Sequence, residues 1–267
     1  MQSGSKSGRP QAKAEDPGGA PDPMHEIVDR VRHITRENER LFQRLIEGER
    51  RFRGLAKAVW KVQEDERRRL ARELHDGLGQ TLTALTHQLE RLQQKVGESV
   101  SDDLADSVEM ARLALNESRE LSRLLRPPVL DDLGLAAALT WLARTLGQRT
   151  GLRVELTLDG LEERLDPDVE TLVFRLVQES LTNVLRHAGV GSAQVAVARA
   201  GGLLELRIAD GGRGFDPQAA LAGREAAGSG LRGMRDRLEL FGGSLELASA
   251  PGQGTLVAAR VPLLEAP

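Results

Sequence analysis

The sequence contains no cysteine and no tyrosine, and aromatic residues make up only 3% of its 267 positions. Without cysteine the chain can form no disulfide, no thiolate zinc site and no cysteine nucleophile, which fits a reducing compartment. The scarcity of aromatic side chains argues against base stacking. A net charge of −3 without a basic face argues against direct binding of nucleic acid. These absences predict a cytoplasmic protein with no direct nucleic-acid partner.

Long apolar runs are also missing. No stretch approaches the roughly 18 apolar residues of a membrane span, and no hydrophobic signal segment stands at the start. We therefore expect no transmembrane segment. Residues 1–23 are rich in Gly, Pro, Ser and Ala without apolar periodicity, which is typical of a disordered tail.

A regular apolar seam follows this tail, and its steps alternate between four and three residues. That spacing predicts a coiled-coil helix over residues 24–62, with the polar Asn38 fixing its register. After Val62 the seam continues in steps of four, a stutter that locally unwinds a supercoil. The seam consists of Ile27, Val31, Ile34, Asn38, Leu41, Leu45, Gly48, Phe52, Leu55, Val59 and Val62.

The stutter coincides with the segment E-R-R-R-L-A-R-E-L-H-D-G-L-G-Q, residues 66–80. Its composition favours a helix, with a predicted buried stripe at Leu70, Leu74 and Leu78. His75 and Asp76 stand beside this stripe, and Gln80 lies about one turn beyond Asp76. Taken alone, such a segment is more often a charged helix with an ordinary surface histidine.

Two long amphipathic helices, broken at Gly97 and stopped by two prolines, predict a helical hairpin over residues 63–127. Two copies would bury their apolar stripes as a four-helix bundle, so we expect a homodimer. Residues 128–267 alternate short helices with strands, and the last four strands are adjacent in sequence, which favours mostly antiparallel pairing. The predicted fold is α plus α/β: a coiled coil and helical hairpin that form a dimeric bundle, followed by an α/β sandwich.

Four spaced elements in this last part indicate a nucleotide site. Each is weak by itself, since glycine loops usually only make turns. Glycines let the backbone approach phosphates at a helix start, an amide oxygen suits Mg²⁺, and an arginine neutralises phosphate charge. A carboxylate at a strand end accepts a hydrogen bond from an amine. The elements are Glu179 to His187 on a helix, D-G-G-R-G-F at residues 210–215, G-S-G-L-R-G-M at residues 228–234, and G-Q-G-T at residues 252–255.

These boxes resemble the nucleotide-binding boxes of the ATPase superfamily shared by histidine kinases, heat-shock chaperones and mismatch-repair ATPases. In the N-terminal half, residues 66–80 and L-R-P-P-V-L-D-D-L-G-L-A-A-A-L (residues 125–139) resemble the nitrate-sensor-like subfamily of two-component sensor histidine kinases. The resemblance covers about residues 62–262, in the family's order.

The resemblance implies a role for each matching residue. His75 would accept the phosphoryl group, Asp76 would be the base that raises its nucleophilicity, and Gln80 would orient a water that dephosphorylates the regulator. ATP and Mg²⁺ are the implied cofactors, with Asn183 and Glu179 holding the metal. The remaining implied nucleotide-binding residues are Arg186, His187, Asp210, Gly212, Gly214, Gly228, Gly230 and Thr255.

The implied partner is a response regulator, one with a LuxR-type helix-turn-helix output domain. Gly211 departs from the family pattern, which commonly has Asn or Asp there, but it removes no named role. Two alternatives stay open on the residues: another ATPase of the superfamily, such as an anti-sigma serine kinase, or a non-catalytic dimeric scaffold. The first leaves the hairpin and H-D-x-x-x-Q unexplained, and the second leaves a complete set of reactive residues unused.

Overall fold

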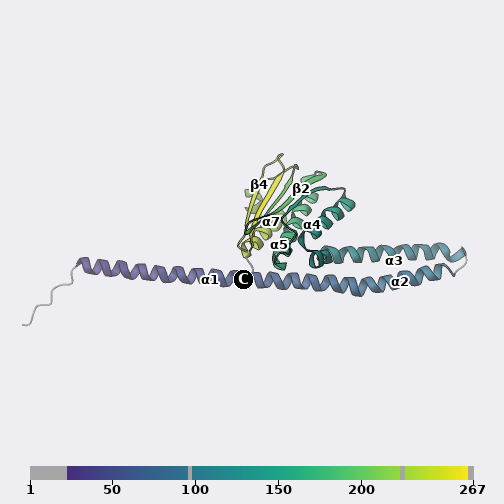
Figure 1. Ribbon diagram of the computed structural model, residues 1–267, viewed down its shortest axis with the longest axis horizontal. Coiled ribbons are helices and arrows are strands. Elements are labelled where there is room, and N and C mark those ends of the chain that lie inside the picture. Colours follow the sequence, from purple (N-terminus) through teal and green to yellow (C-terminus); the bar gives the residue numbers. More distant parts are fainter. Residues whose placement is uncertain (1–22, 96–97, 223–225, 264–267) are drawn as a thin grey trace, which may run out of the picture. The chain divides into compact units, whose positions relative to one another are not determined.

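A computed structural model describes residues 23–95, 98–222 and 226–263. Its N-terminal part is helical: α1 (Pro23–Glu73), a π-helical segment η1 (Leu74–Leu78), α2 (Gly79–Gln93) and α3 (Glu98–Leu125). Helices α2 and α3 lie side by side as a hairpin (Figure 1), and Arg112 of α3 donates to Glu90 of α2 at 2.7 Å. The long helix and the hairpin are thus confirmed. Within the described ranges no helix is long and apolar enough to cross a lipid bilayer.

The apolar seam of α1 is exposed in the single chain. Leu45 is 72% exposed and Phe52 is 73% exposed. Further along, Leu70 and Leu78 are exposed and only Leu74 is half-buried, so the stripe predicted there is not buried within one chain. The apolar side chains of this seam are therefore exposed in the single chain.

The C-terminal part is a mixed α/β domain. A five-stranded sheet has the order β1-β2-β3-β5-β4, in which β1 pairs parallel to β2 and the other neighbours are antiparallel. The mostly antiparallel pairing expected from the sequence is confirmed. The elements are α4 (Pro128–Thr150), β1 (Arg153–Asp159), α5 (Pro167–Asn183), the π-helical η2 (Val184–Ala188), β2 (Ser192–Ala200), β3 (Leu203–Asp210), α6 (Pro217–Ala222), α7 (Ala226–Leu240), β4 (Ser244–Ser249) and β5 (Thr255–Pro262).

The core of this domain lies between one face of the sheet and the helices α4, α5 and α7, which cover it (Figure 1). Alternate residues of the strands point into the core, as the period of two requires. On α5 a nearly continuous run from Val169 to Val177 is buried, because the helix is enclosed on several sides. The fully buried side chains include Leu139, Leu172, Leu176, Leu204, Leu206, Met234 and Leu238.

A buried ion pair ties α1 to α5. The Arg175 guanidinium donates to both carboxylate oxygens of Glu64, at 2.8 to 3.2 Å, and both side chains are 6% exposed. Burial lowers the pKa of Arg175, and the ion pair with Glu64 partly offsets this effect. Close by, Trp60 of α1 packs edge-to-face against Phe241 at 5.1 Å between ring centroids. The ion pair thus joins α1 to α5, and the ring contact joins α1 to the turn that follows α7.

Two helix boundaries differ from the sequence expectation. The helix expected at residues 231–240 already begins at Ala226, and α6 was not expected. The helix expected at residues 135–146 begins at Pro128 and continues to Thr150 across a kink at Gly134, where φ is +83°. Proline at the first helical position explains the earlier start of α4.

Candidate nucleotide and phosphoacceptor sites

A cavity of about 300 Å³ brings several predicted nucleotide residues together. Asn183 ends α5, and Arg186 and His187 follow in η2, whereas Asp210 and Thr255 come from neighbouring strands. The spacing within residues 183–187 places three polar side chains at one end of α5. The predicted residues that line this cavity are Asn183, Arg186, His187, Asp210, Gly214 and Thr255.

Asp210 is held at the end of β3, opposite Thr255 of β5 in the antiparallel register. Its Oδ1 accepts a hydrogen bond from the Gly212 backbone N–H at 2.8 Å. Within the described residues Oδ2 has no hydrogen-bond partner, so it remains able to accept one from a ligand amine. The Asn183 amide likewise has no partner among the described residues. Both groups suit a polar ligand in the cavity.

Glycine is required beside Asp210. A Cβ on Gly214, where φ is +58°, would overlap the Ala250 carbonyl oxygen. A Cβ on Gly254, where φ is +72°, would overlap the Asp210 carbonyl oxygen. A Cβ on Gly212 would stand 2.6 Å from the Ala188 carbonyl oxygen. The backbone therefore packs closely around Asp210, and only glycine fits these three positions; of the three, Gly214 lines the cavity.

Four of the predicted residues do not line this cavity: Gly212, which packs against Ala188, and Glu179, Gly228 and Gly230. Glu179 is half-buried on α5, one turn before Asn183, and does not line the cavity. A Cβ on Gly230 would overlap Glu179 Oε1, so α7 packs closely over α5 there. Gly228 lies in the first turn of α7 rather than before it, which corrects the expected helix start. Of the two glycines, only Gly228 therefore keeps a backbone N–H without an intrahelical partner.

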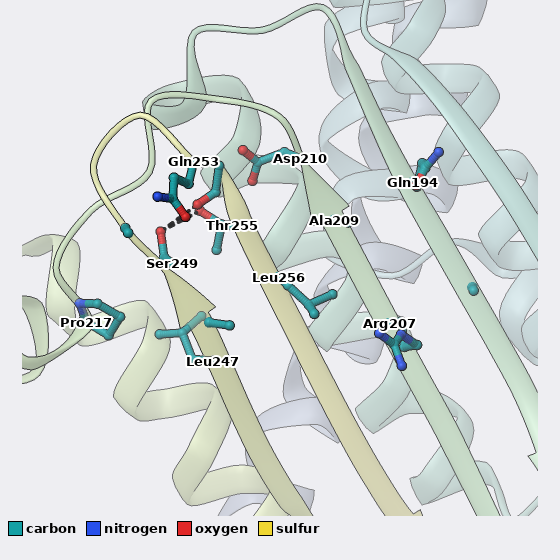
Figure 2. A pocket seen from close by; sticks show the side chains of 14 residues that line it. Gln194, Arg207, Ala209, Asp210, Pro217, Leu247, Ser249, Gln253, Thr255 and Leu256 are labelled. Atoms are coloured by element: carbon teal, nitrogen blue, oxygen red, sulfur yellow. Dashed lines mark hydrogen bonds between the residues drawn. The ribbon is translucent and has the colours of Figure 1, made fainter.

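A larger and more open cavity of about 750 Å³ adjoins the same strand ends on the other face of the sheet. Figure 2 shows Asp210 and Thr255 side by side there, with Ser249 hydrogen-bonded to Thr255 at 3.3 Å. It is lined by no residue of α5 or η2. Of these two cavities, the smaller one joins Asn183, Arg186 and His187 to Asp210, and the larger one does not.

A separate cavity of about 460 Å³ surrounds the predicted phosphoacceptor. His75 and Asp76 lie in η1 and Gln80 in α2, and all three line this cavity with exposed side chains. The stutter in the sequence marks the place where the helix widens to a π-turn, a feature frequent at functional sites. His75 and Asp76 make no hydrogen bond or ion pair within the described residues.

The sequence reasoning missed several residues that line these cavities. Arg213 and Phe215 line the smaller nucleotide cavity, and both stand in the D-G-G-R-G-F motif, which could have pointed to them. Arg119 lines the phosphoacceptor cavity from α3. No motif marked Arg119, because it lies 44 positions after His75 and only the hairpin brings the two together.

The C-terminal domain, with its sheet and cavity, also matches a known protein family in sequence. Residues 168–265 match the family of histidine kinase-, DNA gyrase B- and HSP90-like ATPases, and this defines the class of the domain. Residues 66–130, which carry His75, match a histidine kinase family. With both halves present in this order, the chain belongs to the sensor histidine kinases.

Curated relatives show the same relationship. The chain is 38% identical over 212 residues to sensor histidine kinase MctS of Rhizobium johnstonii, covering 78% of this chain and 46% of that protein. It is 33% identical over 248 residues to oxygen sensor histidine kinase NreB of Staphylococcus carnosus, covering 91% of this chain and 65% of that protein. The chain thus spans between about half and two thirds of the length of these relatives.

Among solved structures, the chain is similar to the histidine kinase domain of a blue-light-activated histidine kinase from Erythrobacter litoralis EL346. The TM-score is 0.42 at 22% identity, covering 68% of this chain and 96% of that one.

Proposed function

We propose that this protein autophosphorylates on His75 with ATP and transfers the phosphoryl group to an aspartate of a response regulator. The observation that carries the proposal is the convergence of Asn183, Arg186, His187, Asp210 and Thr255 on one cavity. A second observation, the grouping of His75, Asp76 and Gln80 around another, supplies the acceptor. No residue lines both cavities, so the two sites must approach one another, within one chain or between two, for the reaction to occur.

The reaction needs a nucleophile and neutralised phosphate charge more than covalent chemistry. A neutral His75 nitrogen attacks the γ-phosphorus of ATP. The N–P bond forms as the bond to the bridging oxygen breaks, and its electron pair leaves on ADP. Asp76 holds the proton on the other ring nitrogen and stabilises the positive charge that develops there. A regulator carboxylate then forms an O–P bond, and the electron pair of the broken N–P bond returns to His75.

The cavity residues fit a nucleoside triphosphate. Asp210 Oδ2 accepts a hydrogen bond from the exocyclic amine of adenine, beside Thr255. Arg186 and His187 contact phosphate or ribose oxygens. Gly212, Gly214, Gly228 and Gly230 shape the cavity and its cover.

Asn183 and Glu179, one turn apart on α5, fit Mg²⁺. Among the described residues no group of three or more His, Asp or Glu side chains could hold a metal ion. An Asn183 oxygen with help from Glu179 suits this ion, because Mg²⁺ keeps several waters and binds through substrate phosphates. When bound, the ion neutralises phosphate charge during transfer.

We also propose a parallel homodimer. The exposed apolar seam of α1 supports it, because water-exposed apolar surface of this extent marks an interaction site. In the proposed organisation, residues 1–23 are a tail, 24–62 a coiled coil, 63–127 the dimerisation and phosphotransfer domain, and 128–267 the ATP-binding domain. Light scattering of the chain at micromolar concentration should give twice the mass of 29.1 kDa. A monomer would contradict the dimer.

Incubation with γ-labelled ATP tests the activity. We expect acid-labile, base-stable label on the wild type and none on His75→Gln, which should still bind nucleotide. Asn183→Ala should lose Mg-ATP-dependent labelling altogether. Label that survives in His75→Gln would show a different acceptor. Acid-stable label would favour a serine kinase, and nucleotide binding without any label would favour a scaffold.

A further inference from the structure

Arg119 is the residue of the phosphoacceptor cavity that comes from the other arm of the hairpin. The cavity is otherwise lined by residues of η1 and α2, including His75, Asp76 and Gln80. Arg119 lies on α3 and its side chain is exposed. The only other basic side chain there besides His75 is His87, and its ring already lies 3.3 Å from the Glu90 carboxylate. Arg119 therefore supplies the one permanent positive charge of this cavity within the described chain.

The register of the hairpin places Arg119 level with His75. Ser122 Oγ of α3 donates to the Ala71 carbonyl oxygen of α1 at 2.7 Å. Helix α3 runs antiparallel to the phosphoacceptor stretch, so one turn back from Ser122 and one turn forward from Ala71 reach the same level. Those steps lead to Arg119 and to His75. The shared cavity agrees with this register.

Arg119 makes no ion pair or hydrogen bond within the described residues. Another arginine of α3 is engaged: Arg112, two turns away, donates to Glu90 at 2.7 Å. Arg69 donates to Glu73 at 3.0 Å. An unengaged guanidinium beside an acceptor histidine is free to bind an anion, and its fork of N–H groups matches the oxygens of a phosphoryl group.

We propose that Arg119 is a phosphate-binding residue of the phosphoacceptor site, which holds the phosphoryl group carried by His75. The inference rests on the proposed role of His75. A phosphoryl group of this kind carries between one and two negative charges near neutral pH. On an exposed helix that charge would otherwise face Asp76, which repels it. Arg119 offsets this repulsion and fixes the orientation in which the regulator aspartate approaches.

The direct readout is the titration of the phosphoryl group itself. A positive neighbour favours the doubly charged form, so the ³¹P resonance of phosphohistidine in wild type should titrate at lower pH than in Arg119→Ala. We expect a difference of about one pH unit, as for one close charge. Arg119→Lys keeps the charge and should retain a midpoint close to wild type. A merely structural role of Arg119 would not move this midpoint.

The autophosphorylation rate at saturating ATP provides a second readout. Arg119→Ala should be slower by about 10²-fold, the effect typical of removing one positioned donor. Arg112→Ala is the matched control: it removes an arginine from the same helix, paired with Glu90 instead of facing His75, and should leave both readouts unchanged. If Arg119→Ala loses helical circular dichroism, Arg119→Gln replaces it in both measurements.

The outcomes separate the two proposals. If His75→Gln still accepts label, the acceptor assignment fails regardless of Arg119. If label maps to His75 but Arg119→Ala and Arg119→Gln keep the wild-type midpoint and rate, the phosphate-binding role of Arg119 is wrong.

Discussion

The two sites of this protein are built in opposite ways. In the proposed phosphoacceptor cavity, His75, Asp76 and Gln80 lie within six consecutive positions of one helical stretch, and of the lining residues only Arg119 comes from another helix. The nucleotide cavity draws on α5, η2, β3, the following loop, α7 and β5. The first arrangement follows from local helical geometry, whereas the second exists only once the sheet has formed.

The two sites share one local feature. Each contains a five-residue π-helical segment: η1 carries His75 and Asp76, and η2 carries Arg186 and His187. A π-turn widens the helix and shifts side chains off the ordinary helical face, which costs stability and is common at functional sites. In η2 the segment ends at Gly189, where φ is +71°, and this glycine terminates the helix. Candidate site residues thus stand where each helix departs from α geometry.

The largest effect should come from breaking the buried ion pair of Glu64 in α1 with Arg175 in α5. Glu64→Ala leaves the buried Arg175 guanidinium with the Leu125 carbonyl and Gln178 as its remaining partners. Loss of one partner of a buried pair costs about 3–5 kcal/mol, because the other charge stays desolvated. The urea midpoint followed by tryptophan fluorescence should fall accordingly, since Trp60 lies one turn from Glu64.

Glu66→Ala is the control for this prediction, because Glu66 is exposed and its partner Arg69 lies on the same helix. We expect no measurable change in its urea midpoint. Equal midpoints for Glu64→Ala and wild type would show that the ion pair does not join α1 to α5 in solution.

A smaller effect is expected for Gln80, whose place in the proposed phosphoacceptor site follows from helical spacing alone. Gln80 shares the cavity of His75, and its amide can hold a water by hydrogen bonds but cannot act as a base. We propose that this water attacks the aspartyl phosphate of the regulator. Gln80→Ala should slow the decay of purified phospho-regulator, with ADP present, by about 10²-fold. Autophosphorylation should remain nearly intact, and an unchanged decay rate would reject this role.

The smallest effect concerns backbone fit at the nucleotide site. Gly254→Ala adds a Cβ against the Asp210 carbonyl oxygen at a left-handed position. We expect a loss of about 2 kcal/mol of stability and weaker ATP binding, measured by thermal unfolding and titration calorimetry. Gly252 has a φ of +79° but open space around it, so Gly252→Ala should lose only the stability that a left-handed alanine costs. Gly77→Ala in η1 meets nothing within 4 Å and should be tolerated. If all three variants behaved alike, close packing at Gly254 would not matter.

Much of the fold could be predicted from periodicity. The long helix, the hairpin and all five strands lie where the apolar periodicity and the glycine and proline residues predict them. This works because residues on one face of a helix or strand share the same buried or exposed environment. The predicted α7 boundary was wrong because glycines at residues 228 and 230 signal a helix start, yet the helix begins at Ala226, before both of them. Intrinsic propensity is only a weak guide to the end of a helix.

The sequence by itself predicted the candidate residues of both sites, because H-D-x-x-x-Q and the glycine boxes have the residue types and spacing that the proposed chemistry needs. Three things were decided only by the tertiary structure. The register of β3 against β5 set Asp210 beside Thr255. The hairpin brought Arg119 to His75. The buried pairing of Glu64 with Arg175 linked α1 to α5 over 111 positions. Such contacts join residues far apart in the chain. A local sequence pattern does not specify which distant side chain will pair with a buried charge.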